Sequence, residues 1–197
     1  MKTPRLELTR LTEDHLPGYH KIWKDPYTTR WSPHGPCKTQ EESKEWMSGL
    51  LPDTNPKGEN YAITLRTPVP PPDSEFIPPA RKSDDDTILT PGAFLGWIGT
   101  WRSEPVPEVG FIFDRGAWGF GFATEALRGF LEGFWDLREE FDVLDAWCDT
   151  ENQASKNVLM KCGFELVEVV YGDYTLEWME PKLRNSFHFR IKRPCKE

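Results

Sequence analysis

Apolar and polar residues follow two distinct periods along the chain, and together these predict a sheet with helices. Alternating apolar residues and short β-branched or aromatic runs predict strands at residues 5–11, 60–66, 93–101, 108–114, 143–149, 164–170 and 187–192. Helical spacing predicts helices at residues 13–23, 39–51 and 152–163. A further helix is expected after Gly121, with one apolar stripe made by Ala123, Leu127, Phe130, Leu131 and Phe134.

The order of these elements predicts one α/β (α+β) domain over residues 1–197. Strand–helix–strand units alternate with hairpins, so we expect a mixed central sheet flanked by helices. Residues 67–93 interrupt the pattern, because seven of the eighteen prolines and the run "KSDDD" fall there. Such a segment cannot pair as a central strand and buries little, which predicts a long flexible loop between two neighbouring strands.

Composition and charge narrow the possible classes of function. Nine Trp and twelve Phe residues indicate a core or a pocket built from large rings. The net charge of −8 argues against nucleic acid as a partner. No apolar run reaches the length of a membrane span or forms a signal-peptide core, so a cytoplasmic protein without a membrane partner is expected.

The four cysteines and four histidines show no spacing typical of metal ligands, so no metal is expected. Cys148 alternates with Trp147 and Asp149 in a predicted strand. This position favours a buried, inert thiol over a nucleophile.

The stretch "WGFGFATEAL" (residues 118–127) places two glycines directly before a predicted helix. The first turn of a helix presents N–H groups that have no acceptor within the helix, and the helix dipole adds to their preference for an anion. Gly119 and Gly121 lack a Cβ, so a phosphate can approach these amides, and Arg115 could add a cation. A tight strand-to-helix turn without a ligand explains the same glycines equally well.

Four ordered motifs together resemble the GNAT acetyltransferases, in particular the branch that includes enzymes acetylating ribosomal-protein N-termini. The motifs are "TPRLELTRL", the hairpin "FLGWIGTW" with "PEVGFIF", the glycine stretch "WGFGFATEAL", and "NQASKNVLMKCGF". The resemblance covers most of the chain apart from the proline-rich loop and the tail. It implies a single-domain GNAT fold with a mixed, mostly antiparallel sheet.

The resemblance also implies acetyl-coenzyme A (acetyl-CoA) as the acetyl donor. Its pyrophosphate is expected on Trp118, Gly119, Phe120, Gly121, Phe122, Ala123 and Thr124, and its pantetheine arm along Phe111, Ile112 and Phe113. Asn152 is expected to contact the arm from the far side. The branch often has Lys where Phe120 stands, so one possible phosphate cation is missing here.

Acetyl transfer to an amine requires a neutral amine, a stabilised oxyanion and a departing thiolate. An alkyl amine has a pKa of about 10, so a carboxylate that removes its proton is useful, and Glu108 is the candidate base. By resemblance it matches the Glu of Glu-Leu-Gly-Tyr, although a strand-end carboxylate facing a loop or water is the alternative. A backbone amide of the Phe111–Phe113 strand could hold the oxyanion.

Thiolate departure needs only modest help from an acid. Many family members have a Tyr where this chain has Leu159, so Ser155 is the candidate to donate to the sulfur. A capping or first-turn serine is the structural alternative for Ser155. Asp114 is expected to be a turn residue, and Glu125 is expected to stabilise the start of the following helix.

The sequence says least about the acceptor. Tyr27, Trp31 and His34 in "DPYTTRWSPHGP" are expected to line its entrance, although packing of the rings onto the sheet explains them too. The expected acceptor is a small-molecule amine or a peptide N-terminus, handled by a monomer or a homodimer. The alternatives are a CoA-binding module without turnover and a purely structural partner protein. The basic tail at residues 182–197 is expected to be a solvated edge strand. Contact with an anionic partner or with the cofactor's 3′-phosphate is the alternative.

Overall fold

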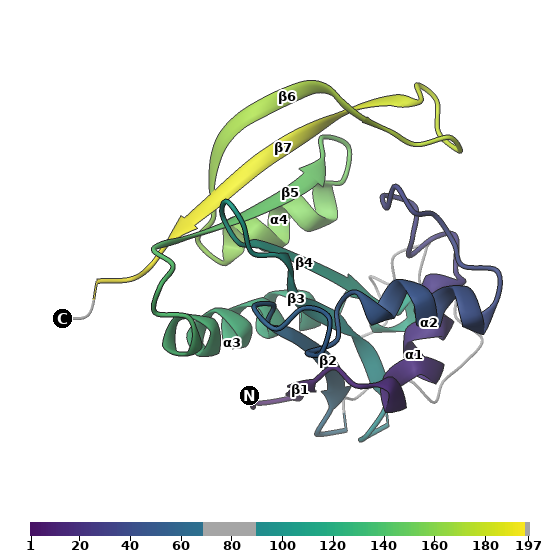
Figure 1. Cartoon of the computed structure of the whole chain (residues 1–197), viewed down its shortest axis with the longest axis vertical. Coiled ribbons are helices and arrows are strands. Elements are labelled where there is room, and N and C mark those ends of the chain that lie inside the picture. The colour runs from purple at the N-terminus through teal and green to yellow at the C-terminus, as the bar shows by residue number, and fades with distance from the viewer. Residues whose placement is uncertain (69–89, 196–197) are drawn as a thin grey trace.

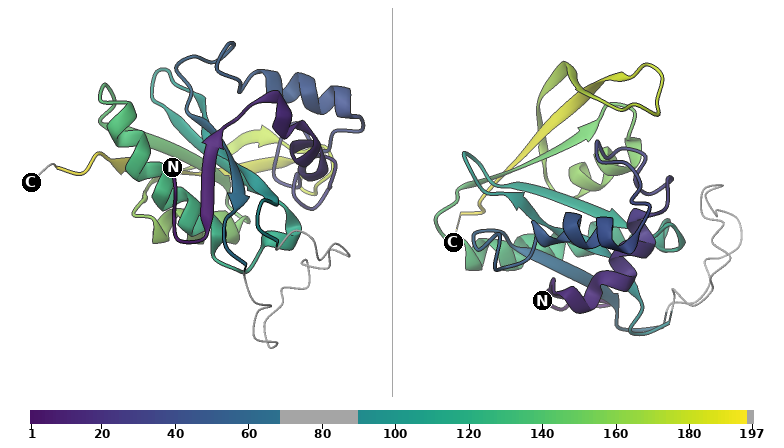
Figure 2. Two further views of the ribbon diagram at one scale, coloured as in Figure 1. Left: turned by 90° about the horizontal axis from the view of Figure 1, so that it is seen from below. Right: turned by 45° about the vertical axis from the view of Figure 1, so that its right-hand side comes forward.

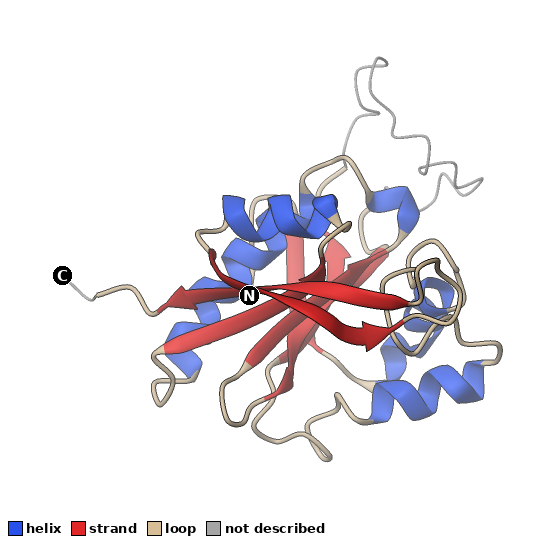
Figure 3. Cartoon of the chain, turned by 90° about the horizontal axis from the view of Figure 1, so that it is seen from above, coloured by secondary structure: helices blue, strands red, loops and turns tan. Residues whose placement is uncertain are grey.

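The computed structural model describes residues 1–68 and 90–195, which form a seven-stranded sheet with helices on both faces (Figures 1 and 3). The strands are β1 (Leu6–Arg10), β2 (Asn60–Leu65), β3 (Phe94–Arg102), β4 (Glu108–Phe113), β5 (Val143–Asp149), β6 (Glu165–Thr175) and β7 (Leu183–Lys192). The α-helices of the described residues are α1 (Leu16–Trp23), α2 (Gln40–Ser48), α3 (Phe122–Leu137) and α4 (Gln153–Lys161). Short 3-10 turns at Glu13–His15 and Arg115–Ala117 precede α1 and α3.

The strand order across the sheet is β1-β2-β3-β4-β5-β7-β6. Neighbouring strands pair antiparallel, except that β4 and β5 run parallel. The α/β fold with a mixed, mostly antiparallel sheet is therefore confirmed, and so is the order of strands and helices along the chain. β2 and β3 are neighbours, as the proline-rich loop between them predicts, while residues 69–89 of that loop lie outside the described residues.

The two faces of the sheet carry separate hydrophobic clusters. α3 and α4 cover one face, where Leu127, Phe130, Leu131 and Phe134 of α3 are buried as the predicted stripe requires. Ala123 lies only at the edge of this cluster, and Phe122 and Trp135 join it instead. α1 and α2 cover the other face, where Tyr19, Trp23 and Met47 pack with Trp97 of β3.

The N-terminal segment runs beside α3 (Figure 2). Glu125, in the first turn of α3, binds this segment through its carboxylate. The carboxylate of Glu125 accepts hydrogen bonds from Thr3 Oγ1 at 2.6 Å and from the Arg5 backbone at 2.8 Å, and it pairs with Arg5 Nε at 2.7 Å. Burial acts to raise the pKa of Glu125, but these bonds outweigh it and lower the pKa. Glu125 therefore has the structural role that its first-turn position predicts.

The prediction of a basic edge strand at the C-terminus is wrong. β7 lies inside the sheet between β5 and β6 (Figure 1). Arg184 and Arg190 bind Asp149 and Asp145 of β5. Arg193 donates to backbone carbonyls of residues 135–141. The helix predicted at residues 39–51 ends at Ser48, whereas β6 and β7 are both longer than predicted.

Candidate active site

The sheet divides into two arms between β4 and β5. In the described residues the two strands share one register pair, Glu108 with Asp145, and they diverge from there toward their carboxyl ends (Figure 1). Beyond this pair, residues Phe111–Phe113 of β4 have a strand neighbour only on the β3 side. An extended ligand can pair with such an edge as an additional strand.

A glycine-rich bend connects the end of β4 to α3. Gly119 and Gly121 have φ angles of 86° and 78°, in the left-handed region that favours glycine. Gly121 is the N-cap residue of α3, and the first bond within the helix runs from Glu125 N to Gly121 O at 3.1 Å. The amides of Phe122, Ala123 and Thr124 belong to the first turn, where no carbonyl of the helix can accept them.

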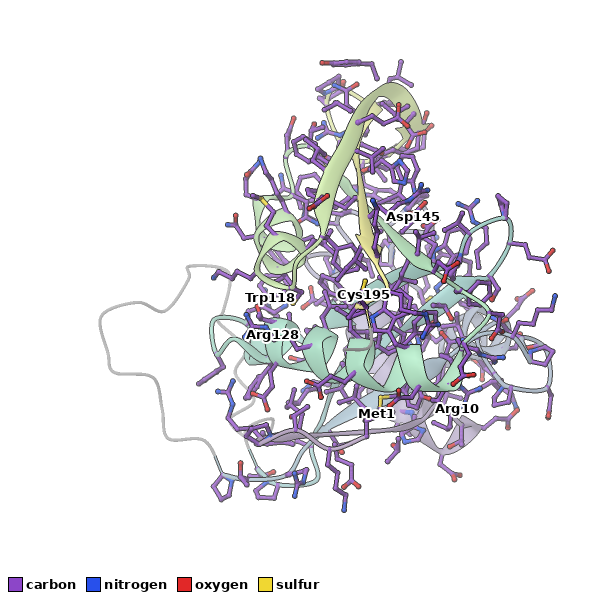
Figure 4. All side chains as sticks on the ribbon, turned by 90° about the vertical axis from the view of Figure 1, so that its left-hand side faces the viewer. Met1, Arg10, Trp118, Arg128, Asp145 and Cys195 are labelled. Atoms are coloured by element: carbon purple, nitrogen blue, oxygen red, sulfur yellow. The ribbon has the colours of Figure 1, made fainter. Side chains whose placement is uncertain are left out.

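The aromatic side chains of this bend pack against the protein and offer no charge to a ligand. Trp118, labelled in Figure 4, lies close to the start of α3, and its Nε1 donates to the Phe113 carbonyl at 3.1 Å. The rings of Phe120 and Phe122 stack with centroids 5.3 Å apart, and the guanidinium of Arg5 lies 4.7 Å from the Phe122 centroid. The groups of this bend that are available to an anion are thus its backbone amides, with the Arg5 guanidinium nearby.

Glu108 lies at the point where the two arms meet. It is 7% exposed, and it accepts from Trp101 Nε1 at 2.9 Å and pairs with Arg102 at 2.5 Å. Burial raises the pKa of Glu108 and the charge of Asp145 adds to this, while Arg102 and Trp101 act in the opposite direction. A carboxylate with a raised pKa is a better proton acceptor than an ordinary surface carboxylate.

Asp145 of β5, labelled in Figure 4, is the register partner of Glu108 and forms a polar group with His188 and Arg190 of β7. It accepts from His188 Nε2 at 2.9 Å and from Arg190 at 2.6 and 2.7 Å. The His188 ring stacks on Trp147 with a centroid distance of 4.2 Å. Burial acts to raise the pKa of Asp145, but Arg190 and His188 outweigh it and lower the pKa. Asp145 is therefore ionised near neutral pH, and Arg190 is paired with it.

The first turn of α4 follows the end of β5 on the other arm. Asn152 is the N-cap residue, and its Oδ1 accepts from the Ser155 amide at 3.2 Å. The capping residue is thus Asn152 and not Ser155. No described residue hydrogen-bonds to the half-buried Ser155 hydroxyl. Leu159, in the place where many family members have Tyr, is 1% exposed and belongs to the core.

The loop after α1, residues 24–38, contacts the turn that follows β4 and the hairpin of β6 and β7. Near β4, Tyr27 is exposed and lies under the Arg115 guanidinium, 4.7 Å from its ring centroid. On the other side, the Trp31 ring lies 5.8 Å from the guanidinium of Arg184 in β7. His34 stands apart from both and packs on Trp46 of α2 at 4.3 Å. Tyr27 and Trp31 therefore flank the opening, whereas His34 lies against α2.

The end of β5 is held by a buried ion pair between Asp149 and Arg184. The guanidinium binds both carboxylate oxygens at 2.9 and 3.0 Å, and Tyr174 donates to Asp149 at 2.7 Å. Burial acts to raise the pKa of Asp149, but the bonds from Arg184, from the Glu151 amide and from Tyr174 outweigh it and lower the pKa. This part of the stability is therefore present at neutral pH and is lost as the pH falls through the lowered pKa.

We expect Arg184→Met to reduce the free energy of unfolding by about 3–5 kcal/mol at pH 7, because it leaves the Asp149 charge buried without its partner. Urea unfolding monitored by circular dichroism measures this loss. Lys182→Met, which removes an exposed lysine paired with Glu177, is the matched control and should change stability by less than about 1 kcal/mol. Equal losses of unfolding free energy for the two substitutions would show that the buried ion pair stabilises the protein no more than an exposed pair does.

Three of the four cysteines are buried, and Cys195 is exposed. Burial raises the pKa of the Cys148 thiol to about 12, with a further contribution from Asp149, so the reactive thiolate is scarce near neutral pH. We expect iodoacetamide to modify Cys195 in the folded protein at pH 7.5 and to leave Cys148 unmodified until denaturant is added. Peptide mass spectrometry measures both sites in one sample, and rapid native labelling of Cys148 would contradict the inert role.

Several residues of this site were not predicted from the sequence. Trp97 and Trp101 lie on both sides of Gly110, where a Cβ would be 3.6 Å from Trp97 and 3.9 Å from Trp101. Asp145 and His188 meet only because β5 and β7 pair in one register. Alternation along each strand predicts which face a side chain occupies. It does not predict which strands are neighbours, so the contact between Asp145 and His188 could not be predicted from the sequence.

Comparison with known proteins identifies the family. A family model described as the acetyltransferase (GNAT) domain matches residues 5–165. This match covers most of the chain, so the protein belongs to the GNAT acetyltransferase family, and the resemblance noted in the sequence motifs is confirmed.

The individual relatives are distant. Uncharacterized protein YkkB of Bacillus subtilis (strain 168) is 33% identical over 94 residues, which are 46% of this chain and 51% of the relative. The chain thus matches about half the length of this curated relative.

Solved structures share the fold at low sequence identity. Spermidine N-acetyltransferase from Vibrio cholerae, solved with CoA and spermine, has a TM-score of 0.71 at 12% identity over 95% of each chain. An acetyl transferase from Salmonella typhimurium that modifies the N-terminal serine of a 50S ribosomal subunit protein has a TM-score of 0.72 at 16% identity, covering 98% of this chain and 97% of its own. At these identities the likeness is one of fold. In the described residues, no helix combines the length and apolar character of a membrane span.

Proposed function

We propose that the protein is an acetyl-CoA-dependent N-acetyltransferase that acts by direct transfer to a primary amine. The observation that carries this proposal is the combination of a single pair joining β4 to β5 with a glycine bend at the end of β4. Because β4 and β5 share only one pair, the free edge of β4 can pair with the amides of the pantetheine chain. The glycine bend presents backbone N–H groups that can bind the diphosphate. Membership of the GNAT family and the CoA complex of the Vibrio cholerae enzyme support the same donor.

The residues present fit the proposed donor. The positive φ angles of Gly119 and Gly121 shape the bend, and the first-turn amides of α3 face outward from it. In this proposal the amides of residues 119–124 bind the pyrophosphate, whereas the Trp118 amide already donates to the Arg115 carbonyl at 3.2 Å. The Phe111–Phe113 edge pairs with the pantetheine arm. Asn152, at the start of α4, contacts the arm from the β5 side. Acetyl-CoA supplies the acetyl group as a thioester.

The chemistry at the site then depends on Glu108. We assign Glu108 as the base that removes a proton from the incoming amine, directly or through a water molecule. Its burial and its raised pKa support this role. The negative charge of Asp145 beside it also raises the pKa of Glu108, so Glu108 binds the proton taken from the amine more strongly. A backbone N–H of the exposed β4 edge stabilises the negative oxygen that forms during transfer. The Ser155 hydroxyl donates to the departing sulfur.

The acceptor is a small-molecule amine or a peptide N-terminus, entering past Tyr27 and Trp31. His34 packs on α2 and is a weaker candidate for acceptor contact. Spermine in the Vibrio cholerae structure and the N-terminal serine modified by the Salmonella typhimurium enzyme represent the two kinds of acceptor.

Release of free thiol from acetyl-CoA, measured over a panel of amines and peptides, tests the proposal. We expect thiol release that depends on the acceptor, with the acetylated product detected by mass spectrometry. Binding of CoA without any acceptor-dependent release would instead indicate a CoA-binding module without turnover, for which the core position of Leu159 is the supporting observation.

A further inference from the structure

An open depression of about 950 Å³ lies beside the carboxyl end of β4, on the face covered by α1. Its charged lining consists of Lys21, Lys24, Lys38 and Arg115, together with Asp25 and Asp114. The residues come from three separate segments: α1 and its end, the loop at residues 36–38, and the turn that follows β4. This convergence places a basic surface at the open end of the two arms.

Two ion pairs account for part of this charge. Lys21 pairs with Asp114 at 3.4 Å, and Arg115 pairs with Asp25 at 3.4 Å. Lys24 and Lys38 are exposed, and no carboxylate of the described residues forms an ion pair with either. The nearby Glu42 lies outside the lining and accepts from the Lys38 backbone amide.

The positive excess of this depression contrasts with the net charge of −8 of the whole chain. Such a local field attracts an anionic group and repels a polycation. The depression adjoins the proposed site, because Asp114 and Arg115 directly follow β4 and Tyr27 contacts Arg115.

The spacing along β4 limits the kind of acceptor. Six residues of nearly extended chain separate Glu108 from Asp114, which corresponds to about 20 Å. An amine at Glu108 and an anion in the depression therefore cannot belong to one free amino acid. An extended peptide covers this span with about five or six residues.

We propose that the acceptor is the N-terminus of a peptide with acidic side chains about four to six positions along it, and that Lys24 and Lys38 recognise those side chains. This inference rests on the proposed acetyltransferase function and defines its substrate class. The depression then acts as a specificity site for acetyl transfer, separate from the group that removes the proton.

Paired peptides test this directly. Two heptapeptides with the same free N-terminus carry either Asp and Glu or Asn and Gln at positions four to six, and spermine serves as a polycationic acceptor. We expect the acidic peptide to have about tenfold higher kcat/KM than its amide twin, mainly through KM, with the difference reduced at 0.5 M salt. Spermine is expected to be the poorest acceptor.

The double substitution Lys24→Gln and Lys38→Gln should lower kcat/KM for the acidic peptide about tenfold, to the value of the amide peptide. Lys44→Gln with Lys182→Gln changes two exposed lysines that pair elsewhere and is the matched control. Equal kcat/KM for the two peptides would overturn the inference while leaving acetyl transfer intact. Weaker CoA binding in the double variant would also overturn it, because the anion recognised would then be a phosphate of CoA. Failure of the unaltered protein to bind CoA would instead contradict the underlying function.

Discussion

Glu108→Gln is expected to lower turnover by about 10²- to 10⁴-fold, the range typical for loss of a general base. The substitution keeps the size of the side chain, and the Gln carbonyl can still accept from Trp101 Nε1. It removes the ability to take the proton from the amine. CoA affinity should be nearly unchanged, because the proposed diphosphate site is formed by amides at the other end of β4. Steady-state kinetics together with calorimetry measures both quantities.

The pH profile separates a base from a structural carboxylate. Activity of the unaltered protein is expected to fall as Glu108 becomes protonated at low pH, and its raised pKa places this fall above the range of an exposed Glu. Arg102→Gln removes a positive charge that lowers the pKa of Glu108, so the acidic limb should move to higher pH while activity at high pH remains. A Glu108→Gln protein with unaltered turnover and profile would exclude Glu108 as the base.

Gly121→Glu is expected to weaken CoA binding by about 100-fold or more. The new carboxylate would lie at the mouth of α3, where like-charge repulsion of a phosphate costs several kcal/mol. Gly121→Ala is the matched control, since both substitutions share the strain of a φ near 78° but only one adds charge. An added Cβ meets only Arg5 Nη2, at 3.8 Å, so space is not the obstacle. Calorimetric titration with CoA compares the two variants.

The comparison between these variants decides the location of the diphosphate. A much larger loss for Glu than for Ala places negative charge of the ligand beside Gly121. Equal affinities of both variants and the unaltered protein would rule out that location. Thermal unfolding of each variant shows how much of any change comes from the backbone strain alone.

Local signals in the sequence predicted most of the fold. The spacing of Leu127, Phe130 and Phe134 defined the buried face of α3. Strand positions followed from alternation because each strand buries one face. The position of β7 between β5 and β6 could not be predicted in this way, since strand order depends on contacts between distant segments.

The candidate site likewise contains parts that local sequence predicted and parts that depend on contacts between distant segments. Glu108 and the glycine bend are continuous in sequence and were predicted from motifs. The Asp145–His188–Arg190 group depends on the pairing of β5 with β7, some 40 residues apart. The basic depression combines α1, the loop at residues 36–38 and the end of β4, and no local pattern links these segments. The Asp145–His188–Arg190 group and the basic depression therefore depend on contacts between segments that are distant in sequence, which the motifs do not contain.

Calorimetric titration of CoA into the unaltered protein tests most directly the claim that the glycine bend and the divided sheet bind a diphosphate carrier. We predict saturable binding of one CoA per chain that weakens as salt is raised, because backbone amides and the helix dipole bind the charged diphosphate. Absence of measurable binding at millimolar CoA, in a protein shown to be folded by circular dichroism, would contradict the claim.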